Sequence, residues 1–299
     1  MPEATHKSGF VALVGRPNAG KSTLLNTLVG EKVSIVTSTP QTTRNRILGV
    51  ANRPGAQVVF VDTPGIHKPL SRLNEQMMHF VRQALAERDL AVLIVDAKAD
   101  FGHGDEFAVG LIKQYSPRTI LVLNKIDLIR KPKLLPLIDR YAKLYAWEEI
   151  FPISAKDGDG VESLLEAVIA RLPEGPAFFP PEIYTDQPER FLASEIIREK
   201  VIDQTRQELP YVTAVLIDEF NEGEEITHIR ASIIVERDSQ KPIIIGAGGA
   251  RIKQIGTEAR IDLEKLLPPK VFLELHVKVE PDWRNSRGLV SSLDYRGDA

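Results

Sequence analysis

Apolar runs alternate with amphipathic segments along the first 172 residues of the chain. The runs are rich in β-branched residues, which is typical of strands, and the segments between them carry apolar residues at helical spacing. The runs cover residues 10–14, 58–61, 90–95, 119–123 and 150–153. Because they lack polar alternation, they predict strands of a parallel sheet that helices cover on both faces.

A proline-rich stretch separates this pattern from a different one. Residues 173–188 hold five prolines and predict a stiff, extended linker. A long helix is expected over 189–208, followed by a hairpin of two strands around a turn at 221–223, a second helical region and a last strand at 271–280. The chain is thus predicted to form an α/β domain (1–175), a linker (176–188) and an α+β domain (189–299).

Composition narrows the functional classes. No apolar run approaches the roughly 20 residues that cross a bilayer, the first eight residues are polar, and the chain has no cysteine for disulfides or thiolate metal sites. We therefore expect a cytoplasmic protein. From residue 183 onward, 21 acidic residues outnumber 16 basic ones, so nucleic-acid binding by the second domain would need a local basic patch.

A phosphate-binding motif follows the first predicted strand. The segment from Gly15 to Ser22 matches the pattern G-x-x-x-x-G-K-[ST] and opens a predicted helix, which is the context that the motif requires. Its backbone N–H groups can cradle phosphate oxygens, Lys21 can offset the charge of the β- and γ-phosphates, and Ser22 can ligate Mg²⁺. The expected nucleotide-binding residues are Gly15, Arg16, Pro17, Asn18, Ala19, Gly20, Lys21, Ser22 and Thr23.

Two further motifs follow strands of the same predicted sheet. Asp62 and Gly65 come directly after one strand, where the carboxylate can hold Mg²⁺ and the Gly65 N–H can meet a γ-phosphate. Asn124, Lys125 and Asp127 follow another strand, where a carboxylate can accept both the N1 and the N2 protons of guanine. Since adenine lacks this pair of donors, the motif predicts specificity for GTP and GDP.

Two weaker signals complete the pattern. The segment Ser154-Ala155-Lys156 can bring a backbone N–H to the guanine O6. The second is the threonine-bearing segment 41–45, which lies between the P-loop helix and Asp62. The order of all these segments resembles the translation-factor class of small GTPases over residues 10–172. By its position in that class, Thr43 is the threonine expected to close over Mg²⁺, with Thr42 as the alternative.

Longer stretches resemble the Era family of bacterial ribosome-assembly GTPases over essentially the whole chain. They are the P-loop sequence Pro-Asn-Ala-Gly-Lys-Ser, the segments Gln-Thr-Thr-Arg and Asp-Thr-Pro-Gly, and residues 244–256. The resemblance implies a P-loop GTPase domain joined to a type II KH domain. It also implies that the KH domain binds the 3′ end of small-subunit ribosomal RNA and that the protein assists assembly of the small ribosomal subunit.

The residue after the D-x-x-G motif bears on the mechanism. Ras-like enzymes carry there a glutamine that orients the attacking water, whereas this chain has Ile66, so we expect slow intrinsic hydrolysis. Relatives with this substitution and a P-loop asparagine use a bound K⁺, which by resemblance makes Asn18 a K⁺ ligand. The alternative is that Asn18 only stabilises the turn. The residues expected to act on the transferred phosphate are Lys21, Thr43, Gly65 and Asn18.

A glycine-rich tetrapeptide marks the expected RNA site. Gly246-Ala247-Gly248-Gly249 fits the GXXG loop with which KH domains clamp about four nucleotides, although a simple turn between helices is the alternative. The order of the surrounding elements, which is that of a type II KH domain, favours the loop. Many members of the family carry a lysine where this chain has Ala247, so backbone N–H groups and flanking residues such as Arg284 and Arg287 are expected to contribute.

Positive charge gathers around this tetrapeptide. Residues 241–270 hold six basic and three acidic side chains, a local surplus within an acidic domain. Arg251 and Lys253 are the best candidates to contact RNA phosphates, and ordinary helix-surface charges are the alternative.

Other readings of the second domain stay open. It could bind a protein or the periphery of a membrane, with GTP hydrolysis regulating that complex. An RNA-modifying enzyme is poorly supported, because the chain has no cysteine nucleophile and no separate cofactor motif. DNA is not an expected partner.

Overall fold

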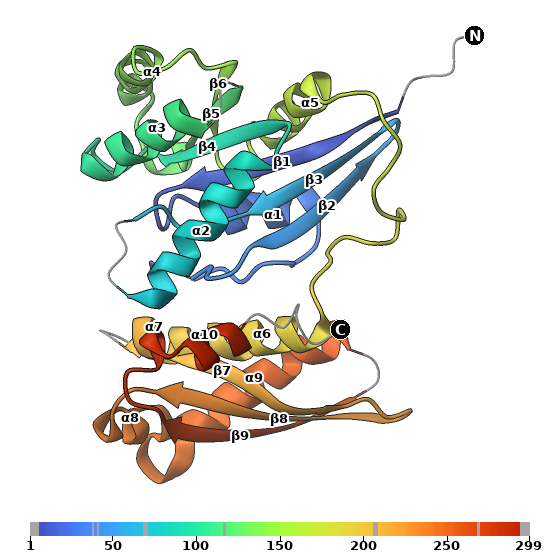
Figure 1. The fold of residues 1–299 in the computed structure, drawn as a ribbon, viewed down its shortest axis with the longest axis vertical. Coiled ribbons are helices and arrows are strands. Elements are labelled where there is room, and N and C mark those ends of the chain that lie inside the picture. Colours follow the sequence, from blue (N-terminus) through green and yellow to red (C-terminus); the bar gives the residue numbers. More distant parts are fainter. Residues whose placement is uncertain are drawn as a thin grey trace. The chain divides into compact units, whose positions relative to one another are not determined.

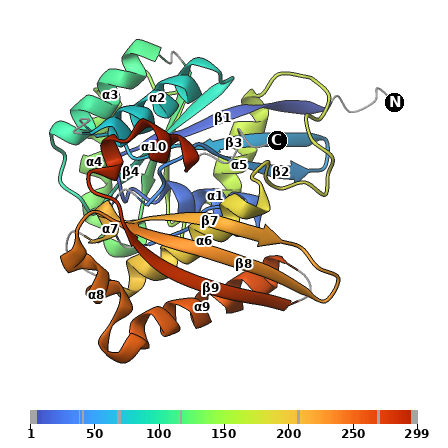
Figure 2. The same cartoon turned by 60° about the horizontal axis from the view of Figure 1, so that its bottom comes forward.

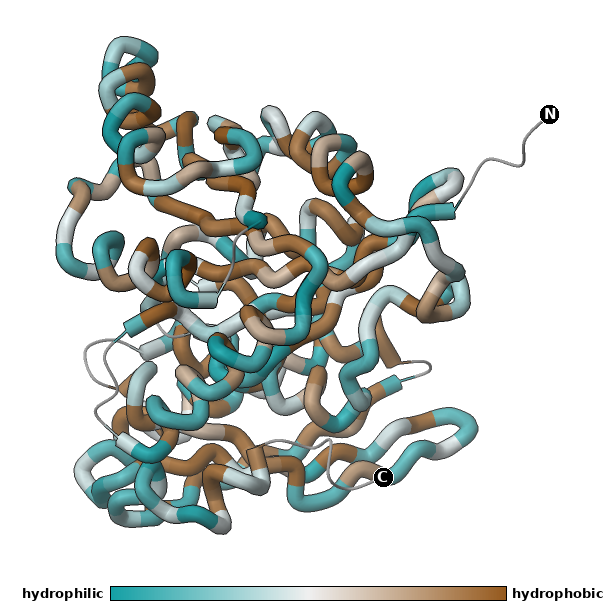
Figure 3. The backbone as a smooth tube through the Cα atoms, turned by 45° about the horizontal axis from the view of Figure 1, so that its top comes forward, coloured by the Kyte–Doolittle hydropathy of each residue, from teal (hydrophilic) through white to brown (hydrophobic). Residues whose placement is uncertain are grey.

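The chain folds into two compact units that divide near Asp186 (Figure 1). The structure is a computed structural model that describes residues 6–37, 39–40, 42–67, 71–115, 118–205, 209–267 and 270–293. Within that part of the chain, no helix is both long and apolar enough to cross a membrane. Figure 3 shows apolar positions concentrated along the interior of each unit and hydrophilic positions on its loops and outer turns.

The first unit is built on a six-stranded sheet in the order β2-β3-β1-β4-β5-β6. All neighbouring strands are parallel except β2 and β3, which form an antiparallel hairpin. The strands are β1 (Lys7–Gly15), β2 (Ile47–Arg53), β3 (Ala56–Asp62), β4 (Leu90–Asp96), β5 (Thr119–Asn124) and β6 (Glu149–Ile153). The sequence pattern did not predict β2, although Gly55, with a φ of +73°, marks the tight turn into β3.

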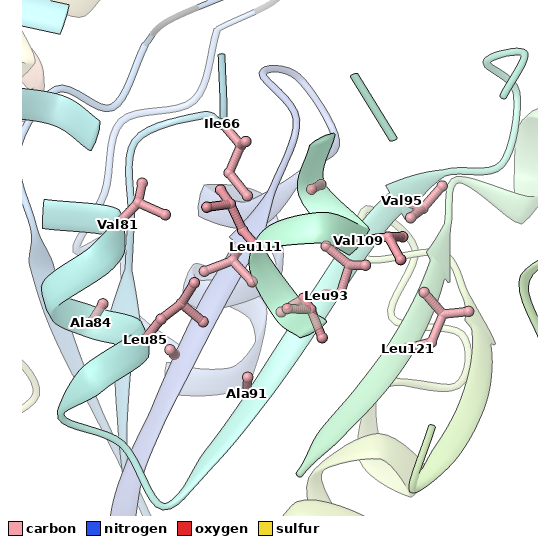
Figure 4. Close-up of a cluster of buried hydrophobic side chains, with 14 of the residues drawn as sticks. Ile66, Val81, Ala84, Leu85, Ala91, Leu93, Val95, Val109, Leu111 and Leu121 are labelled. Carbon is pink, nitrogen blue, oxygen red and sulfur yellow. The ribbon is translucent and has the colours of Figure 1, made fainter. Parts of the chain in front are cut away.

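Helices cover both faces of this sheet, as the unbroken apolar strands predict. One face packs against α2 and α3, and the side chains of Val81, Leu93 and Leu111 meet there in a buried cluster (Figure 4). The other face carries α1 and α5, which contact each other. The helices are α1 (Lys21–Val29), α2 (Arg72–Ala86), α3 (His103–Tyr115), α4 (Leu134–Ala142) and α5 (Val161–Arg171).

The proline-rich segment that the sequence predicts as a linker is hydrogen-bonded to the edge of the first unit. The Val50 N–H of β2 donates to the Tyr184 carbonyl at 2.9 Å, and the Thr185 hydroxyl donates to Leu48 O at 2.8 Å. The Gln57 side chain on β3 accepts the backbone N–H groups of Phe178 and Phe179. Residues 176–186 therefore cover an edge strand that would otherwise expose unpaired backbone groups.

The second unit is an α+β layer whose sheet has the order β7-β8-β9 (Figure 2). Strands β7 and β8 are antiparallel and β8 and β9 are parallel, while α6 and α9 pack against each other. The first strand begins at Ala214 because residues 209–212 form a helical turn before it. The elements are α6 (Glu189–Gln204), α7 (Leu209–Val212), β7 (Ala214–Asn221), β8 (Ile226–Val235), α8 (Lys241–Ile245), α9 (Ala250–Leu266), β9 (Lys270–Val279) and α10 (Arg287–Ser292).

Candidate nucleotide and nucleic-acid sites

The P-loop connects the end of β1 with the start of α1. Gly20 has a φ of +94°, and a Cβ there would collide with the Asn124 side chain, so only glycine fits. The D-x-x-G segment, which follows β3, lies against the P-loop: a Cβ on Gly65 would lie 2.7 Å from the backbone of Pro17. These close approaches bring three segments that are far apart in sequence into one compact site.

A cavity of about 300 Å³ lies between the P-loop and the segments that follow α1. Its lining includes eight of the residues that the sequence assigns to the nucleotide, together with Thr43. The eight residues are Pro17, Asn18, Gly20, Lys21, Ser22, Thr23, Gly65 and Lys125. The cavity is therefore positioned to receive the phosphates at the positive end of α1.

Lys21 is the buried cation of this cavity. Its Nζ donates to the carbonyl oxygens of Arg16 at 3.0 Å and Gly15 at 3.3 Å. Burial lowers the pKa of the Lys21 ammonium from 10.5 to about 8, and the negative charge of Asp62 partly opposes this shift. A lysine held in this way can exchange its carbonyl partners for phosphate oxygens, which are stronger acceptors.

Three hydroxyl groups converge on the buried carboxylate of Asp62. Its Oδ2 accepts from Ser22 Oγ at 2.7 Å, from Ser34 Oγ at 3.3 Å and from Thr43 Oγ1 at 3.4 Å, and the Ser22 and Thr43 hydroxyls are 2.8 Å apart. Thr42 instead bonds to the Thr37 hydroxyl. Burial raises the pKa of the Asp62 carboxyl, and the charge of Lys21 lowers it.

This oxygen cluster fits a magnesium ion. Asp62 Oδ1 is buried without a hydrogen-bond partner, an arrangement that is costly unless a cation satisfies the oxygen. Ser22, Thr43 and Asp62 supply hard oxygen ligands only, which is the donor set that Mg²⁺ prefers. Among the described residues, no group of three or more His, Cys, Asp or Glu side chains could form a metal site of another kind.

The two residues after Gly65, Ile66 and His67, contact other parts of the first unit. Ile66 is 2% exposed and belongs to the apolar cluster with Val81 and Leu111 (Figure 4), so it cannot orient a water molecule. His67 contacts Gly65 O through Nδ1 at 2.7 Å, and its Nε2 contacts the Asn74 side-chain amide. The imidazole thus contacts the carbonyl group of Gly65, the residue whose N–H the sequence assigns to the γ-phosphate.

Asn124 connects the P-loop with the segment Ser154-Ala155-Lys156. Its amide donates to Ala19 O at 2.8 Å and its carbonyl accepts the Ala155 N–H at 2.9 Å, so this side chain joins the P-loop to the segment Ser154-Ala155-Lys156. Ser154 is buried, and its hydroxyl donates to Asp157 at 3.1 Å. Asn124 therefore holds the backbone of these two segments in place.

Lys125 and Asp127 differ in exposure and partners. Lys125, with a φ of +68°, donates through Nζ to Asn18 O at 2.6 Å and to Asp96 Oδ2 at 2.7 Å. Asp127 lies in the short helix η1 (Ile126–Leu128) and is exposed. Lys156, in the segment Ser154-Ala155-Lys156, is exposed as well. The Asp127 carboxylate is accessible to the donors of a base.

The sequence did not predict a second support of the P-loop, at Arg16. Its Nη1 donates at 2.7 Å to Asp105 Oδ2, on a carboxylate that is 4% exposed at the start of α3. The same oxygen accepts the Gly102 N–H at 3.0 Å. Burial raises the pKa of the Tyr141 hydroxyl, and the charge of Asp105 and a hydrogen bond to it raise this pKa further. An acidic residue three positions after a glycine at a helix start is a weak capping signal that could have drawn attention to Asp105.

The GXXG tetrapeptide lies between α8 and α9 of the second unit. Gly246 has a φ of +75°, and a Cβ there would meet the Arg251 backbone at 2.9 Å, so the loop depends on glycine at this point. Gly248 and Gly249 also have positive φ values, at +57° and +81°, but open space surrounds both. Ala247 is exposed. The loop backbone is thus accessible to a nucleic-acid backbone.

The charges around this loop divide into paired and accessible groups. Toward the end of α9, Arg260 pairs with Glu264 and Lys265 with Asp262. Residues 240–257, which surround the loop, contain no acidic residue. Positive charge is therefore least offset at the loop end of α9.

The individual basic candidates differ in their partners. Lys253 is exposed, whereas Arg251 is half-buried and donates to the Ile243 carbonyl. Arg284, a flanking candidate from the sequence, forms two hydrogen bonds with Glu236 at 2.8 and 3.0 Å, while Arg287 is exposed. Lys253 is the candidate best placed for a phosphate.

Phosphate-binding loops occur in many ATPases, but a loop tied to an N-K-x-D segment through Asn124 and Lys125 is typical of GTP-binding proteins. The first unit is therefore a P-loop GTPase domain. Residues 10–125 match the family model described as 50S ribosome-binding GTPase, and residues 208–284 match the KH domain model.

Relatives extend the match over the whole chain. GTPase Era of Geobacter metallireducens is 50% identical over 297 residues, 99% of this chain and 100% of that protein, and GTPase Era of Leuconostoc citreum is 50% identical over 298 residues, 99% and 98%. A crystal structure of Era in complex with MgGDPNP and nucleotides 1506–1542 of 16S ribosomal RNA is 43% identical, with a TM-score of 0.92 over 97% of this chain and 99% of that chain. A variant of Aquifex aeolicus Era bound to GDP.AlF4- is 44% identical, with the same TM-score and coverage. The chain belongs to the Era family.

Family membership confirms the predictions of fold and class. The chain is a GTPase with an α/β P-loop domain followed by an α+β type II KH domain. GTP or GDP and Mg²⁺ are the nucleotide and metal of this family.

Proposed function

We propose that this chain is a GTP-hydrolysing switch whose KH domain binds the 3′ end of small-subunit ribosomal RNA and which assists assembly of the small ribosomal subunit. One observation carries the nucleotide half of the proposal: Asp62 Oδ1 is a buried, unpartnered oxygen beside the Ser22 and Thr43 hydroxyls. Together with Lys21 in the adjoining cavity, this is the environment that a metal-bound triphosphate requires.

The phosphates and the metal are assigned to the P-loop side of the site. Ser22, Thr43 and Asp62 would hold Mg²⁺, which when bound neutralises charge on the β- and γ-phosphate oxygens. Lys21 offsets further phosphate charge, and the Gly65 N–H donates to the γ-phosphate. Loss of that phosphate would release Thr43 and Gly65 together, which makes these two segments the moving parts of the switch.

The guanine base is assigned to the N-K-x-D side. Asp127 accepts the N1 and N2 protons of guanine, and Asn124 and Lys125 hold the loops around it. A backbone N–H of the segment Ser154-Ala155-Lys156 meets O6. Adenine would leave the Asp127 carboxylate unpaired, so the site discriminates against ATP.

A potassium ion is assigned to the P-loop near Asn18. Asn18 lines the cavity at a φ of +60°, and the position that carries the water-orienting glutamine in Ras-like enzymes holds the buried Ile66. A monovalent cation there would supply positive charge during phosphoryl transfer, a task that an arginine finger performs elsewhere.

The RNA is assigned to the GXXG loop and the residues that follow it. Gly246, Ala247, Gly248 and Gly249 offer backbone N–H groups, and Arg251 and Lys253 offer charge within an acid-free segment. The crystal structure of a relative, Era with nucleotides 1506–1542 of 16S ribosomal RNA, supports this choice of partner. We likewise assign the protein to the cytoplasm.

The test uses the full-length chain. Turnover of GTP and ATP is measured with and without Mg²⁺, and binding is measured to a single-stranded RNA of the 3′ end of small-subunit ribosomal RNA and to an RNA of the same composition in scrambled order. We expect turnover only of GTP with Mg²⁺, and tighter binding of the 3′-end RNA. Equal binding of the two RNAs would favour a protein-binding role of the second domain, and equal turnover of ATP would overturn the guanine assignment.

A further inference from the structure

The first unit has a second cavity, which lies beside α4 and shares no lining residue with the nucleotide cavity in the described part of the chain. It has a volume of about 790 Å³ and is lined by the loop after β4 and by the segment that leads from η1 through η2 (Lys131–Lys133) into α4. We name it the α4 cleft. Its size lies within the range of ordinary ligand sites.

The walls of the α4 cleft are largely aliphatic. Leu128, Ile129 and Leu137 line it together with two prolines, Pro132 and Pro136. Apolar residues in this area are also unusually accessible, since the side chain of Leu128 is 53% exposed. Leu135, in the first turn of α4 but outside the cleft lining, is 74% exposed. Exposed aliphatic groups around a cleft mark an interaction site.

The rim of the α4 cleft is positively charged. Four exposed cations line it, and Asp100 is the one acidic residue among its described lining residues. In the described part of the chain, none of the four forms an ion pair with an acidic side chain. They are Lys98, Arg130, Lys133 and Arg140. A rim of this charge attracts an acidic ligand and repels a basic one.

The aromatic residue of the cleft, Phe101, is engaged by two neighbouring side chains. The Phe101 and Tyr141 rings meet edge to face, with 5.5 Å between their centroids, and the Arg140 guanidinium lies over the Phe101 ring at 5.6 Å from its centroid. Single-stranded RNA sites usually offer free aromatic faces for stacking. The aliphatic walls of the α4 cleft instead match leucine or isoleucine side chains.

We propose that the α4 cleft is a docking site for an acidic peptide segment of a partner protein, whose aliphatic side chains enter the cleft while its carboxylates meet the four rim cations. An amphipathic helix with leucines at helical spacing and acidic residues between them has this chemistry. The site is separate from both the nucleotide cavity and the GXXG loop.

The test measures fluorescence anisotropy with the full-length, GDP-bound protein. The probe is a fluorescein-labelled peptide of about 14 residues, long enough for four helical turns, with leucine at positions i, i+3, i+4 and i+7 and glutamate elsewhere. The comparison probes are the same peptide with lysine in place of glutamate, and a single-stranded RNA of about 10 nucleotides that lacks the 3′-end sequence. We expect saturable binding of the acidic peptide and none of the lysine peptide.

Two charge-matched double variants locate the site. Lys98→Glu with Lys133→Glu should weaken binding of the acidic peptide roughly tenfold or more, because two attractive charges become repulsive. Lys32→Glu with Lys113→Glu changes the net charge equally, at exposed positions outside the cleft lining, and should leave binding within about twofold. Leu128→Asp tests the apolar wall and should also weaken binding.

The outcomes distinguish a specific peptide site from a general effect of net charge. Loss of peptide binding in the cleft variants alone, with thermal unfolding unchanged, supports the site. Equal loss in both double variants would reduce the attraction to net charge and overturn the proposal. The proposal would also be overturned if the parent protein did not bind the acidic peptide. It would likewise be overturned if the parent protein bound the comparison RNA and the Lys98→Glu, Lys133→Glu variant did not.

Discussion

Lys21 illustrates how burial tunes a single side chain for its task. Its ammonium group lies among backbone carbonyls close to the Asp62 carboxylate, and burial lowers its pKa to about 8. The unfolded chain holds this proton up to the ordinary pKa of 10.5, so the unfolded state binds more protons between about pH 8 and 10.5. The contribution of Lys21 to the stability of the nucleotide-free protein therefore rises with pH across that window.

The same shift predicts a pH dependence of nucleotide affinity. A neutral Lys21 amine cannot offset phosphate charge, so GTP affinity should fall roughly tenfold between pH 7 and 9 as the protonated fraction falls. Calorimetric titrations in buffers of different ionisation enthalpy would also show proton uptake on binding near pH 8. Lys21→Arg keeps its charge throughout and serves as control. Affinity that is flat from pH 7 to 9 in the parent protein would contradict the prediction.

Asp127 predicts the base specificity. In Asp127→Asn the amide cannot accept two protons from guanine, and GTP affinity should fall roughly 10- to 100-fold, since hydrogen bonds to a charged group are strong. The new amide can donate to the additional carbonyl of xanthine, so xanthosine triphosphate should bind better than GTP. Competition between the two nucleotides measures the exchange. A variant that still preferred GTP would remove Asp127 from the base site.

Asn18 predicts a dependence on the monovalent cation. GTP hydrolysis should be roughly tenfold faster in K⁺ than in Na⁺ at equal concentration, because one charge-stabilising group at a transition state is typically worth at least that much. Asn18→Ala should remove the difference while leaving Mg²⁺ dependence intact. Steady-state phosphate release in the two salts is the measurement, and equal rates in the parent protein would exclude the cation.

At the scale of elements, the P-loop is held by the N-K-x-D motif and by one residue that no motif includes, Asp105. Helix α3 contributes the buried Asp105, which binds the Arg16 side chain, while β5 contributes Asn124, which binds Ala19 O. Lys125 then reaches Asn18 O. Three consecutive parts of the loop are thus fixed by different elements, which keeps the phosphate-binding N–H groups oriented before a ligand binds.

Asp105→Asn tests this support. The amide leaves Arg16 without its carboxylate, and since the arginine side chain is 39% exposed, we expect a modest loss of stability of roughly 2 kcal/mol. Because Arg16 belongs to the P-loop, the Kd for GTP should rise as well. Thermal unfolding and nucleotide titration measure the two effects. Glu106→Gln, at an exposed position one residue further along α3, is the matched control and should change neither.

At the scale of the whole molecule, each unit has its own core and its own candidate site. The core of the first unit lies between its sheet and helices, and the second unit buries Ile229, Ile233 and Trp283, whose indole donates to Val212 O at 2.7 Å. Independent cores allow one site to be disabled while the other persists. A switch that couples RNA to GTP then requires RNA to engage one unit and bias the other.

A double variant of the GXXG loop tests this division of labour. Ala247→Asp with Gly248→Asp places two carboxylates against RNA phosphates and should lower affinity for the 3′-end RNA roughly 10- to 100-fold through like-charge repulsion. Any acceleration of GTP hydrolysis by RNA should disappear, while hydrolysis without RNA stays unchanged. Ala247→Asn with Gly248→Asn has nearly the same shape without the charge and is the control. RNA binding at parental strength, at matched ionic strength, would overturn the KH-loop assignment.

The sequence by itself determined the features that depend on local order. A glycine loop between a strand and a helix, an N-K-x-D segment after another strand, and a GXXG tetrapeptide between helices can each be recognised from a few consecutive residues, because strand and helix periodicity places them at element ends. The absence of polar alternation likewise predicted the covered parallel sheet. Ile66 could be recognised from the sequence as lacking a polar group, since this follows from residue type alone.

Only the tertiary structure decided which distant groups meet. It brings Thr43, and not Thr42, against Asp62, and it pairs Arg284 with Glu236. It also shows the proline-rich segment hydrogen-bonded along β2, a strand that the sequence did not reveal. The physical reason is common to all three: a hydroxyl, a guanidinium or an edge backbone group can pair with many partners, and only packing brings one of them within hydrogen-bond distance while burying it from water.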